Sequence, residues 1–242
     1  NGLEKIKLFV LDMDGTFYLG NQILEGSLDF LQKVINTGRE FMFFTNNSSK
    51  TDTDYIQKLS NMNCPITDKQ IMTSGDVMIA YLQTYHRNKK VYLMGTDTLK
   101  KDFQQKGIHL VEQQQPDVVV VAFDLSLTYE KLERACTYIR NGAIFLATHL
   151  DIHCPTECGF IPDCGAMCSA IALSTGVKPK YVGKPFHETI EMILKETGYK
   201  KEEIAIVGDR LYTDVATGVN NGIMGILVLS GETKKEDLQQ SE

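Results

Sequence analysis

The chain has 242 residues, of which 43% are hydrophobic and 23% are charged, and its formal net charge at pH 7 is -6. This acidic balance argues against a broad electropositive surface for nucleic acid or for an anionic membrane. No apolar stretch is long enough to span a bilayer, and the N-terminus shows no signal-peptide pattern. We therefore expect a cytoplasmic protein that has neither nucleic acid nor membrane as a partner.

The first predicted element is a short apolar strand at residues 7–11, followed directly by Asp12-Met13-Asp14-Gly15-Thr16. Such a run, bounded by turn residues, is typical of a buried parallel strand. Two unpaired carboxylates are too costly to bury in a core, so Asp12 and Asp14 are expected at the exit of this strand. Ligands of open α/β sheets bind at that edge.

The next elements alternate in type. Residues 17–21 are expected to form a flap or short loop, residues 25–37 a helix, residues 40–45 a strand and residues 51–63 a second helix. The strand ends in Thr45-Asn46-Asn47-Ser48-Ser49, a series of hydroxyl and amide side chains. This β-α-β-α order predicts a parallel sheet with right-handed crossovers.

The middle of the chain, residues 75–177, is large enough to form an α/β domain of its own. Its apolar patterns predict three strands, at residues 90–94, 117–123 and 143–148, and four helices, at residues 75–85, 97–106, 129–141 and 166–175. The stretch 154–168 is rich in Gly, Pro and Cys and is expected to be a long ordered loop. The core is then discontinuous and consists of residues 1–74 and 178–242.

The four cysteines of this stretch form two C-x3-C pairs, Cys154/Cys158 and Cys164/Cys168. Zinc sites usually use C-x2-C or C-x4-C spacings, and a reducing cytosol keeps thiols free. The pattern therefore favours free thiols, although it leaves a metal at these cysteines open.

The closing section returns to the alternating pattern. A strand begins at Tyr181-Val182, Gly183-Lys184-Pro185 follows it, and residues 186–197 are expected to be helical. A strand at residues 203–208 then ends in Asp209. Further predicted elements are a helix at residues 214–221 and a strand at residues 223–229.

Parallel strands would bring four carboxylates to one edge of the sheet, together with a lysine and polar donors: Asp12, Asp14, Asp209 and Asp214 with Lys184, Thr45 and Asn47. Carboxylates that lie so near one another repel unless a cation lies between them. A ligand set made only of oxygen favours Mg²⁺, which commonly binds one or two carboxylates and a substrate phosphate. The lysine and the polar donors would neutralise a phosphoryl group. These residues therefore predict a phosphate ester as the substrate.

The same residues resemble the four motifs of the haloacid-dehalogenase superfamily. Thr45-Asn46-Asn47-Ser48-Ser49 and the stretch from Gly208 to Asp214 are similar to those of its NagD and para-nitrophenylphosphatase-like branch. The resemblance implies a doubly wound parallel-sheet core of the Rossmann-like type, with a large inserted α/β cap of the C2 type. It also implies a phosphatase of small phosphorylated metabolites.

The resemblance further implies a role for each matching residue. Asp12 would be the nucleophile and Asp14 the general acid and base. The expected ligands of Mg²⁺ are Asp12, Asp14 through its backbone carbonyl, and Asp209. The expected phosphate-binding residues are Gly15, Thr45, Asn46, Asn47 and Lys184, with Thr16 and Asp214 in support. In the cap, Asp151 and His153 are expected to select the substrate, and Arg210 is interpreted as structural or electrostatic.

Other functions remain open on the sequence alone. The motifs also fit phosphoryl transfer to a second substrate, as in a mutase, or a non-catalytic metabolite-binding regulator. A dehalogenase is disfavoured, since that chemistry does not need Asp14 as an acid and base. Sugar phosphates, nucleotides and other small esters all remain candidate substrates. Exposed cap strands could pair in a homodimer.

Overall fold

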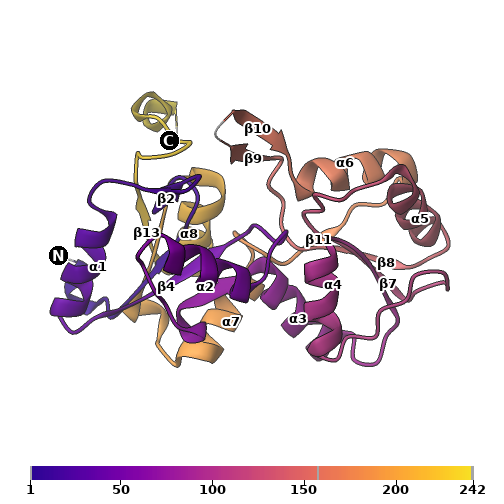
Figure 1. The fold of residues 1–242 in the computed structure, drawn as a ribbon, viewed down its shortest axis with the longest axis horizontal. Helices are drawn as coiled ribbons and strands as arrows, with labels where there is room; N and C mark the ends of the chain where they lie inside the picture. Colours follow the sequence, from indigo (N-terminus) through magenta and orange to yellow (C-terminus); the bar gives the residue numbers. More distant parts are fainter. Residues whose placement is uncertain (1, 157, 241–242) are drawn as a thin grey trace.

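The structure, a computed structural model, describes residues 2–156 and 158–240, and it contains two parallel sheets side by side (Figure 1). The core sheet has the strand order β13-β12-β1-β4-β5, and all its neighbouring strands run parallel. Its strands are β1 (Leu8–Leu11), β4 (Glu40–Thr45), β5 (Ile71–Thr73), β12 (Ile204–Gly208) and β13 (Met224–Leu227). The two ends of the chain therefore build one doubly wound sheet, as predicted.

The register of the core sheet places the polar strand ends together. Leu11 lies beside Phe43 on one side and beside Val207 on the other. Because these three strands are parallel and in this register, the residues that follow them leave the sheet at the same edge. Asp12, Thr45 and Asp209 are thus neighbours in space although they are far apart in sequence.

Helices cover both faces of the core sheet. On one face lie α1 (Ser27–Asn36) and α2 (Asp52–Asn61), whose Leu31, Val34, Tyr55 and Leu59 belong to one apolar cluster. The other face is covered by α3 (Ser74–Tyr85) and α7 (His187–Thr197), and α8 (Ala216–Asn221) packs against α7. Both faces of every central strand are therefore buried, which explains their continuous apolar sequences.

The second sheet is the α/β cap that the resemblance implies. It has the order β11-β8-β7-β6 and is parallel throughout. Its elements are β6 (Val91–Met94), α4 (Asp97–Gln105), β7 (Val118–Val121), α5 (Tyr129–Arg140), β8 (Ile144–Ala147), α6 (Cys164–Thr175) and β11 (Lys180–Tyr181). The domain limits at residues 75 and 177 stay a prediction. Strand β11, which belongs to the cap sheet, lies just beyond the limit at residue 177.

The sheets share apolar packing. One cluster of buried side chains runs from Val10 of β1 through Val77 and Leu82 of α3 to Leu93 and Val120 of the cap strands. Helix α3 therefore joins the two halves. A continuous core of this kind restricts how far the halves can move as rigid bodies.

Two local predictions differ from the structure, and the predicted flap gains a defined structure. The stretch predicted as a loop contains an antiparallel hairpin of β9 (His153–Thr156) and β10 (Gly159–Pro162). Its prolines and glycine hide the strand pattern in the sequence. A small hairpin, β2 (Tyr18–Leu19) and β3 (Gln22–Ile23), forms the flap. A π-helical turn over Leu211–Val215 precedes α8, where one helix from residue 214 was expected.

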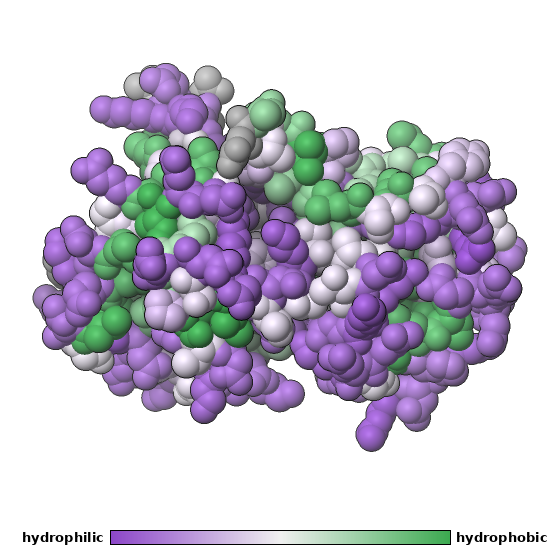
Figure 2. Space-filling view, viewed as in Figure 1, coloured by the Kyte–Doolittle hydropathy of each residue, from purple (hydrophilic) through white to green (hydrophobic). Residues whose placement is uncertain are grey.

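The molecular surface in Figure 2 is largely hydrophilic, with apolar side chains gathered over the cap near β10 and α6. Phe160 and Leu173 are among the exposed apolar residues of these two elements. Within residues 2–156 and 158–240, no helix has both the length and the apolar character that crossing a membrane requires. The homodimer through the cap and the cytoplasmic location stay predictions.

Candidate active site

Lys184 lies between two carboxylates at the edge of the core sheet. Its Nζ is 2.6 Å from Oδ1 of Asp12 and 2.6 Å from Oδ1 of Asp214. The lysine is 3% exposed, so burial lowers its pKa, but the two carboxylates raise that pKa by more and keep the ammonium group charged. Asp214 also accepts a hydrogen bond from the backbone N–H of Arg210. The predicted neighbourhood of Asp12, Lys184 and Asp214 is thus present.

Asp14 lies beside this group and lines the same small polar crevice as Asp12 and Lys184. Desolvation raises the pKa of Asp14 to about 6; Asp12 also raises it, whereas Lys58 and Arg210 lower it. A carboxyl group with such a pKa can exist in both protonation states near neutral pH, which suits a proton donor and acceptor. Its two-residue spacing from Asp12 lets both carboxyl groups reach the crevice from the end of β1.

Asp209 completes the acidic edge. It accepts hydrogen bonds from Oγ1 of Thr16 at 3.1 Å and from the backbone N–H of Glu232 at 2.6 Å. Gly15 has a φ of +88°, and a Cβ atom there would lie 2.8 Å from Oδ2 of Asp209. Glycine is therefore required at this position for both the turn and the approach of Asp209.

The donor set at this edge fits a hard cation. Asp12, Asp209 and Asp214 each offer one carboxylate oxygen, and these atoms lie within 4.8 Å of one another. Burial raises the pKa of Asp209, and the charge of Asp12 raises it further. Lys184 and Arg210 are cations beside the three acids, but Arg210 is paired with Asp151 and Glu232, so the acids remain short of positive charge. Oxygen ligands alone are typical of Mg²⁺ and similar ions.

The polar segment after β4 contributes in two ways. Oγ1 of Thr45 accepts a hydrogen bond from the backbone N–H of Asn47, and both residues line the crevice. The amide group of Asn46 is already engaged, since it donates to the backbone carbonyl of Lys184 and to Asp151 and accepts from the N–H of Lys184. Asn46 therefore holds the lysine segment and the cap in place.

Asp151 is the cap residue that reaches the core. It is 4% exposed and accepts a hydrogen bond from Nδ2 of Asn46 at 3.2 Å. Nη1 of Arg210 lies 3.4 Å from Oδ2 of Asp151, and Nε of Arg210 lies 2.9 Å from Glu232. Asp151 and Glu232 raise the pKa of Arg210 despite its burial, so this side chain is a fixed positive charge in the crevice.

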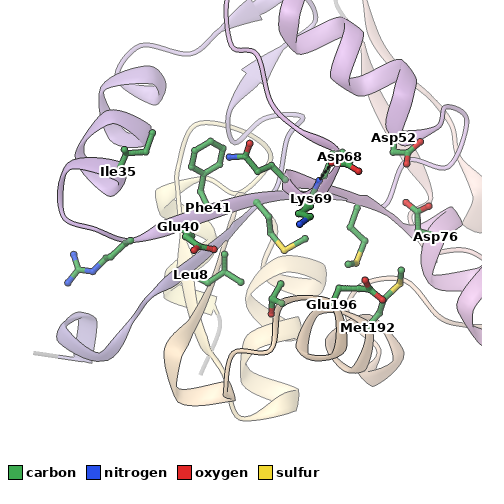
Figure 3. A pocket seen from close by; sticks show the side chains of 16 residues that line it. Leu8, Ile35, Glu40, Phe41, Asp52, Asp68, Lys69, Asp76, Met192 and Glu196 are labelled. Carbon is green, nitrogen blue, oxygen red and sulfur yellow. Dashed lines mark hydrogen bonds between the residues drawn. The ribbon is translucent and has the colours of Figure 1, made fainter.

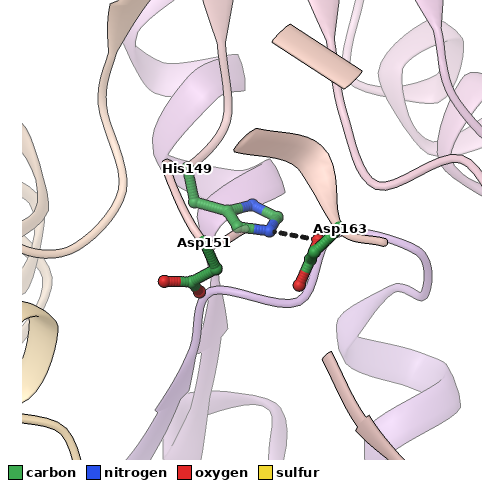
Figure 4. A group of neighbouring side chains, drawn as sticks. All are labelled: His149, Asp151 and Asp163. Atoms are coloured by element: carbon green, nitrogen blue, oxygen red, sulfur yellow. Dashed lines mark hydrogen bonds and ion pairs between the residues drawn. The ribbon is translucent and has the colours of Figure 1, made fainter. Parts of the chain in front are cut away.

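A buried ion pair lies behind this contact (Figure 4). Nε2 of His149 is 2.8 Å from Oδ1 of Asp163, and both residues are buried. Burial lowers the pKa of His149, but Asp163 and other neighbouring groups outweigh it and raise that pKa to about 9. His149, Asp151 and Asp163 could together hold a metal ion by distance. His149 and Asp163 are hydrogen-bonded to each other, whereas Asp151 is bonded to Asn46 of the core, so the group lies at the joint between cap and core.

His153 is not among the residues that line the crevice, and its role in substrate selection stays a prediction. It begins β9, and its ring packs on Phe160 with 4.6 Å between the ring centroids. The cap residues that line the crevice are Asp151, Cys154, Pro155 and Asp163.

The cysteines are free thiols among the described residues, as the sequence favours. Cys164 and Cys168 are buried on one side of α6 with their sulfur atoms 4.0 Å apart. No cysteine of residues 2–156 and 158–240 belongs to a group with metal-binding geometry. Cys154, for which the sequence left a thiol or a metal ligand open, lines the crevice.

A large hollow lies away from this acidic edge. A hollow of about 840 Å³ lies beside the first residues of β1, β4 and β5, at Leu8, Glu40 and Ile71 (Figure 3). These are the amino ends of the strands, opposite the edge that carries Asp12. Its lining mixes apolar side chains with charges of both signs, and it contains none of the predicted site residues.

Comparisons with known proteins agree with this geometry. A family described as haloacid dehalogenase-like hydrolase matches residues 9–109, and one described as HAD-hydrolase-like matches residues 181–242. An acid sugar phosphatase of Staphylococcus epidermidis is 34% identical over 99% of this chain and 93% of its own length. The 5'-nucleotidase YutF of Bacillus subtilis is 34% identical over 98% of this chain and 92% of its own.

A solved structure extends the agreement to the fold. The crystal structure of a 4-nitrophenylphosphatase from Thermotoga maritima matches with a TM-score of 0.95 and 46% identity. The match covers 100% of this chain and 93% of that one. The predicted resemblance is therefore confirmed over the core and the cap together. The chain belongs to the haloacid dehalogenase-like hydrolases and is a phosphatase of that family.

Proposed function

We propose that the protein is a Mg²⁺-dependent phosphomonoesterase that acts on small phosphorylated metabolites through an aspartyl-phosphate on Asp12. The observation that carries this proposal is the arrangement of Asp12, Lys184 and Asp14 in one crevice. A nucleophile, a fixed cation and a titratable acid are the groups that such a reaction needs. The names of the relatives support sugar phosphates and nucleotides as candidate substrates.

In the first half of the reaction, a carboxylate oxygen of Asp12 attacks phosphorus. The bond between phosphorus and the ester oxygen breaks, and protonated Asp14 gives its proton to the departing alcohol. Lys184 stabilises negative charge on the phosphoryl oxygens. Thr45, Asn47 and the backbone N–H groups near Gly15 orient that group.

In the second half, a water oxygen attacks phosphorus while Asp14, now a carboxylate, takes a proton from it. The bond between phosphorus and Asp12 breaks, which frees phosphate and restores both carboxyl groups to their first state. Asp12 and Asp209, with the backbone carbonyl of Asp14, would hold Mg²⁺, and Asp214 would keep Lys184 in position. The bound ion would offset the negative charge of phosphate and carboxylates in this crevice.

The experiment is a phosphate-release assay on para-nitrophenyl phosphate and a panel of sugar phosphates and nucleotides, with MgCl₂ and with EDTA. We expect turnover with MgCl₂ and its loss with EDTA. The Asp12→Asn variant should lose at least about 10³-fold in kcat while keeping its circular dichroism spectrum. Turnover close to that of the wild type in this variant would exclude Asp12 as the nucleophile.

A further inference from the structure

A second hollow, of about 380 Å³, adjoins the crevice and shares Asp14, Asn47 and Pro155 with it. Its remaining walls come from the flap, from Lys50 and helix α2, and from two residues of the cap hairpin: Tyr18, Gly20, Asn21, Lys50, Tyr55, Lys58, Thr156 and Cys158. Because Asp14 lines both spaces, an ester whose phosphoryl group fills the crevice would place its alcohol part in this hollow. We call it the leaving-group pocket.

Two lysines give the leaving-group pocket a positive lining. Nζ of Lys58 lies 3.7 Å from the ring centroid of Tyr18, a cation–π contact that fixes the ammonium group at the wall. Within residues 2–156 and 158–240, neither Lys50 nor Lys58 has a carboxylate within ion-pair distance. Burial lowers the pKa of Lys58, and Lys50 lowers it further, whereas Asp14 raises it. Among the described residues that line this pocket, Asp14 is the acidic group that faces these lysines.

Polar groups of the same pocket also lack partners. The Tyr18 side chain is buried, and its hydroxyl group has no hydrogen-bond partner within the part of the chain that the structure describes. Nδ2 of Asn47 has only a long contact, 3.9 Å, to the sulfur of Cys154. Asn47 is half-buried and lines the pocket, so its amide group can donate to an acceptor of a ligand, whereas the Tyr18 hydroxyl is closed to solvent.

We propose that the leaving-group pocket binds an anionic oxygen group, a carboxylate or a second phosphate, carried by the alcohol part of the substrate. This rests on the proposed phosphatase function and narrows its substrates to phosphate monoesters of acidic alcohols. Lys50 and Lys58 supply charge-assisted hydrogen bonds to that anion. Asp14 is protonated when it acts as the acid, so it does not repel the anion at that step.

Three esters with three-carbon alcohols test this inference: 2-phosphoglycerate, propane-1,3-diol bisphosphate and glycerol 2-phosphate. The first carries a carboxylate, the second carries another phosphate, and the third has a neutral alcohol. We expect kcat/KM for at least one of the anionic esters to exceed that for glycerol 2-phosphate by about tenfold or more. Comparing kcat/KM for the two anionic esters shows whether the pocket prefers a carboxylate or a phosphate.

Lys58→Met and the more exposed Lys50→Met should each bring the ratio of kcat/KM between the anionic esters and glycerol 2-phosphate close to one, mainly by raising KM for the anionic esters. The matched control is Lys195→Met, on the exposed side of α7, which should change nothing. Equal rates for all three esters in the wild type would overturn the proposal. So would an equal loss on all three esters in both lysine variants.

Failure of the phosphatase function would look different. If no ester is hydrolysed, para-nitrophenyl phosphate included, titration calorimetry with the same three compounds decides. Tighter binding of an anionic ester than of glycerol 2-phosphate, lost in Lys58→Met, would uphold the pocket and reject the reaction. Equal binding of all three would reject both.

Discussion

Nη1 of Arg210, in the core, lies 3.4 Å from Oδ2 of Asp151, in the cap, and both side chains are almost fully buried. Asn46 donates to the same carboxylate, so two core residues hold one cap residue. A buried charge is costly without its partner, and the pair therefore favours the arrangement in which cap and core are docked. This contact ties the cap to the loop that carries Asp209 and Asp214.

Asp151→Asn removes the charge and keeps the size of the side chain. We expect the free energy of unfolding to fall by about 3 kcal/mol, because Arg210 keeps Glu232 as its only acidic partner within ion-pair distance among the described residues. KM should rise for every ester, since cap docking encloses the whole crevice. Urea unfolding and steady-state kinetics measure the two effects. The exposed Asp29→Asn is the control, and identical behaviour of the two variants would show that the ion pair contributes nothing.

Lys184→Met leaves the buried carboxylate of Asp214 without its cation. At pH 7.5 we expect a loss of about 3–5 kcal/mol in the free energy of unfolding. Burial raises the pKa of Asp214 in the folded protein, so the folded state takes up a proton before the unfolded state does as the pH falls. The loss should therefore shrink on acidification towards pH 5. Urea unfolding at both pH values checks this, and a loss that does not depend on pH would contradict it.

The ion pair of His149 and Asp163 predicts a second pH dependence. The folded pKa of His149 is raised to about 9, whereas an unfolded histidine titrates near 6.5. This stabilisation, about 3 kcal/mol, is complete below pH 6.5 and is lost as the pH rises through 9. His149→Gln should remove that slope from thermal unfolding profiles, and the exposed His187→Gln should keep it. A wild-type profile that is flat between pH 6.5 and 9 would be inconsistent with the pair.

Asp14→Asn separates the two proton transfers proposed for Asp14. The nitrophenolate of para-nitrophenyl phosphate leaves without a proton, whereas the second half of the reaction still needs a base. We expect a rapid release of about one nitrophenolate per protein and then turnover slowed by about 10²–10⁴-fold. Stopped-flow absorbance measures the burst. Steady release without a burst, at the wild-type rate, would remove Asp14 from the mechanism.

Much of the core could be predicted from the sequence because its signals are local. Each parallel strand is a continuous apolar run, and the polar residues that follow it must meet at one edge. Asp12, Thr45 and Asp209 were therefore grouped correctly. The contact of Lys184 with Asp214 agrees with the supporting role that the resemblance implies.

The cap side of the site could not be predicted in the same way. The hairpin that contains His153 carries prolines and glycine in place of an alternating pattern, so neither its strands nor the facing of their side chains shows in the sequence. Lys50 and Lys58 lie near a predicted helix start and on its surface, where lysine is ordinary. In the folded protein, residues of the flap and of the cap hairpin lie around these lysines. The lysines therefore line a pocket that the sequence does not show.

The aspartyl-phosphate on Asp12 is the central claim, and chemical trapping tests it most directly. The protein is mixed with para-nitrophenyl phosphate and MgCl₂, quenched in acid and reduced with borohydride, which converts an acyl phosphate of aspartate to homoserine. Peptide mass spectrometry then locates the change. We predict homoserine at position 12, enriched in Asp14→Asn and absent from Asp12→Asn. Phosphate release by the wild type, with an unchanged aspartate at position 12 in every trapped sample, would contradict the account.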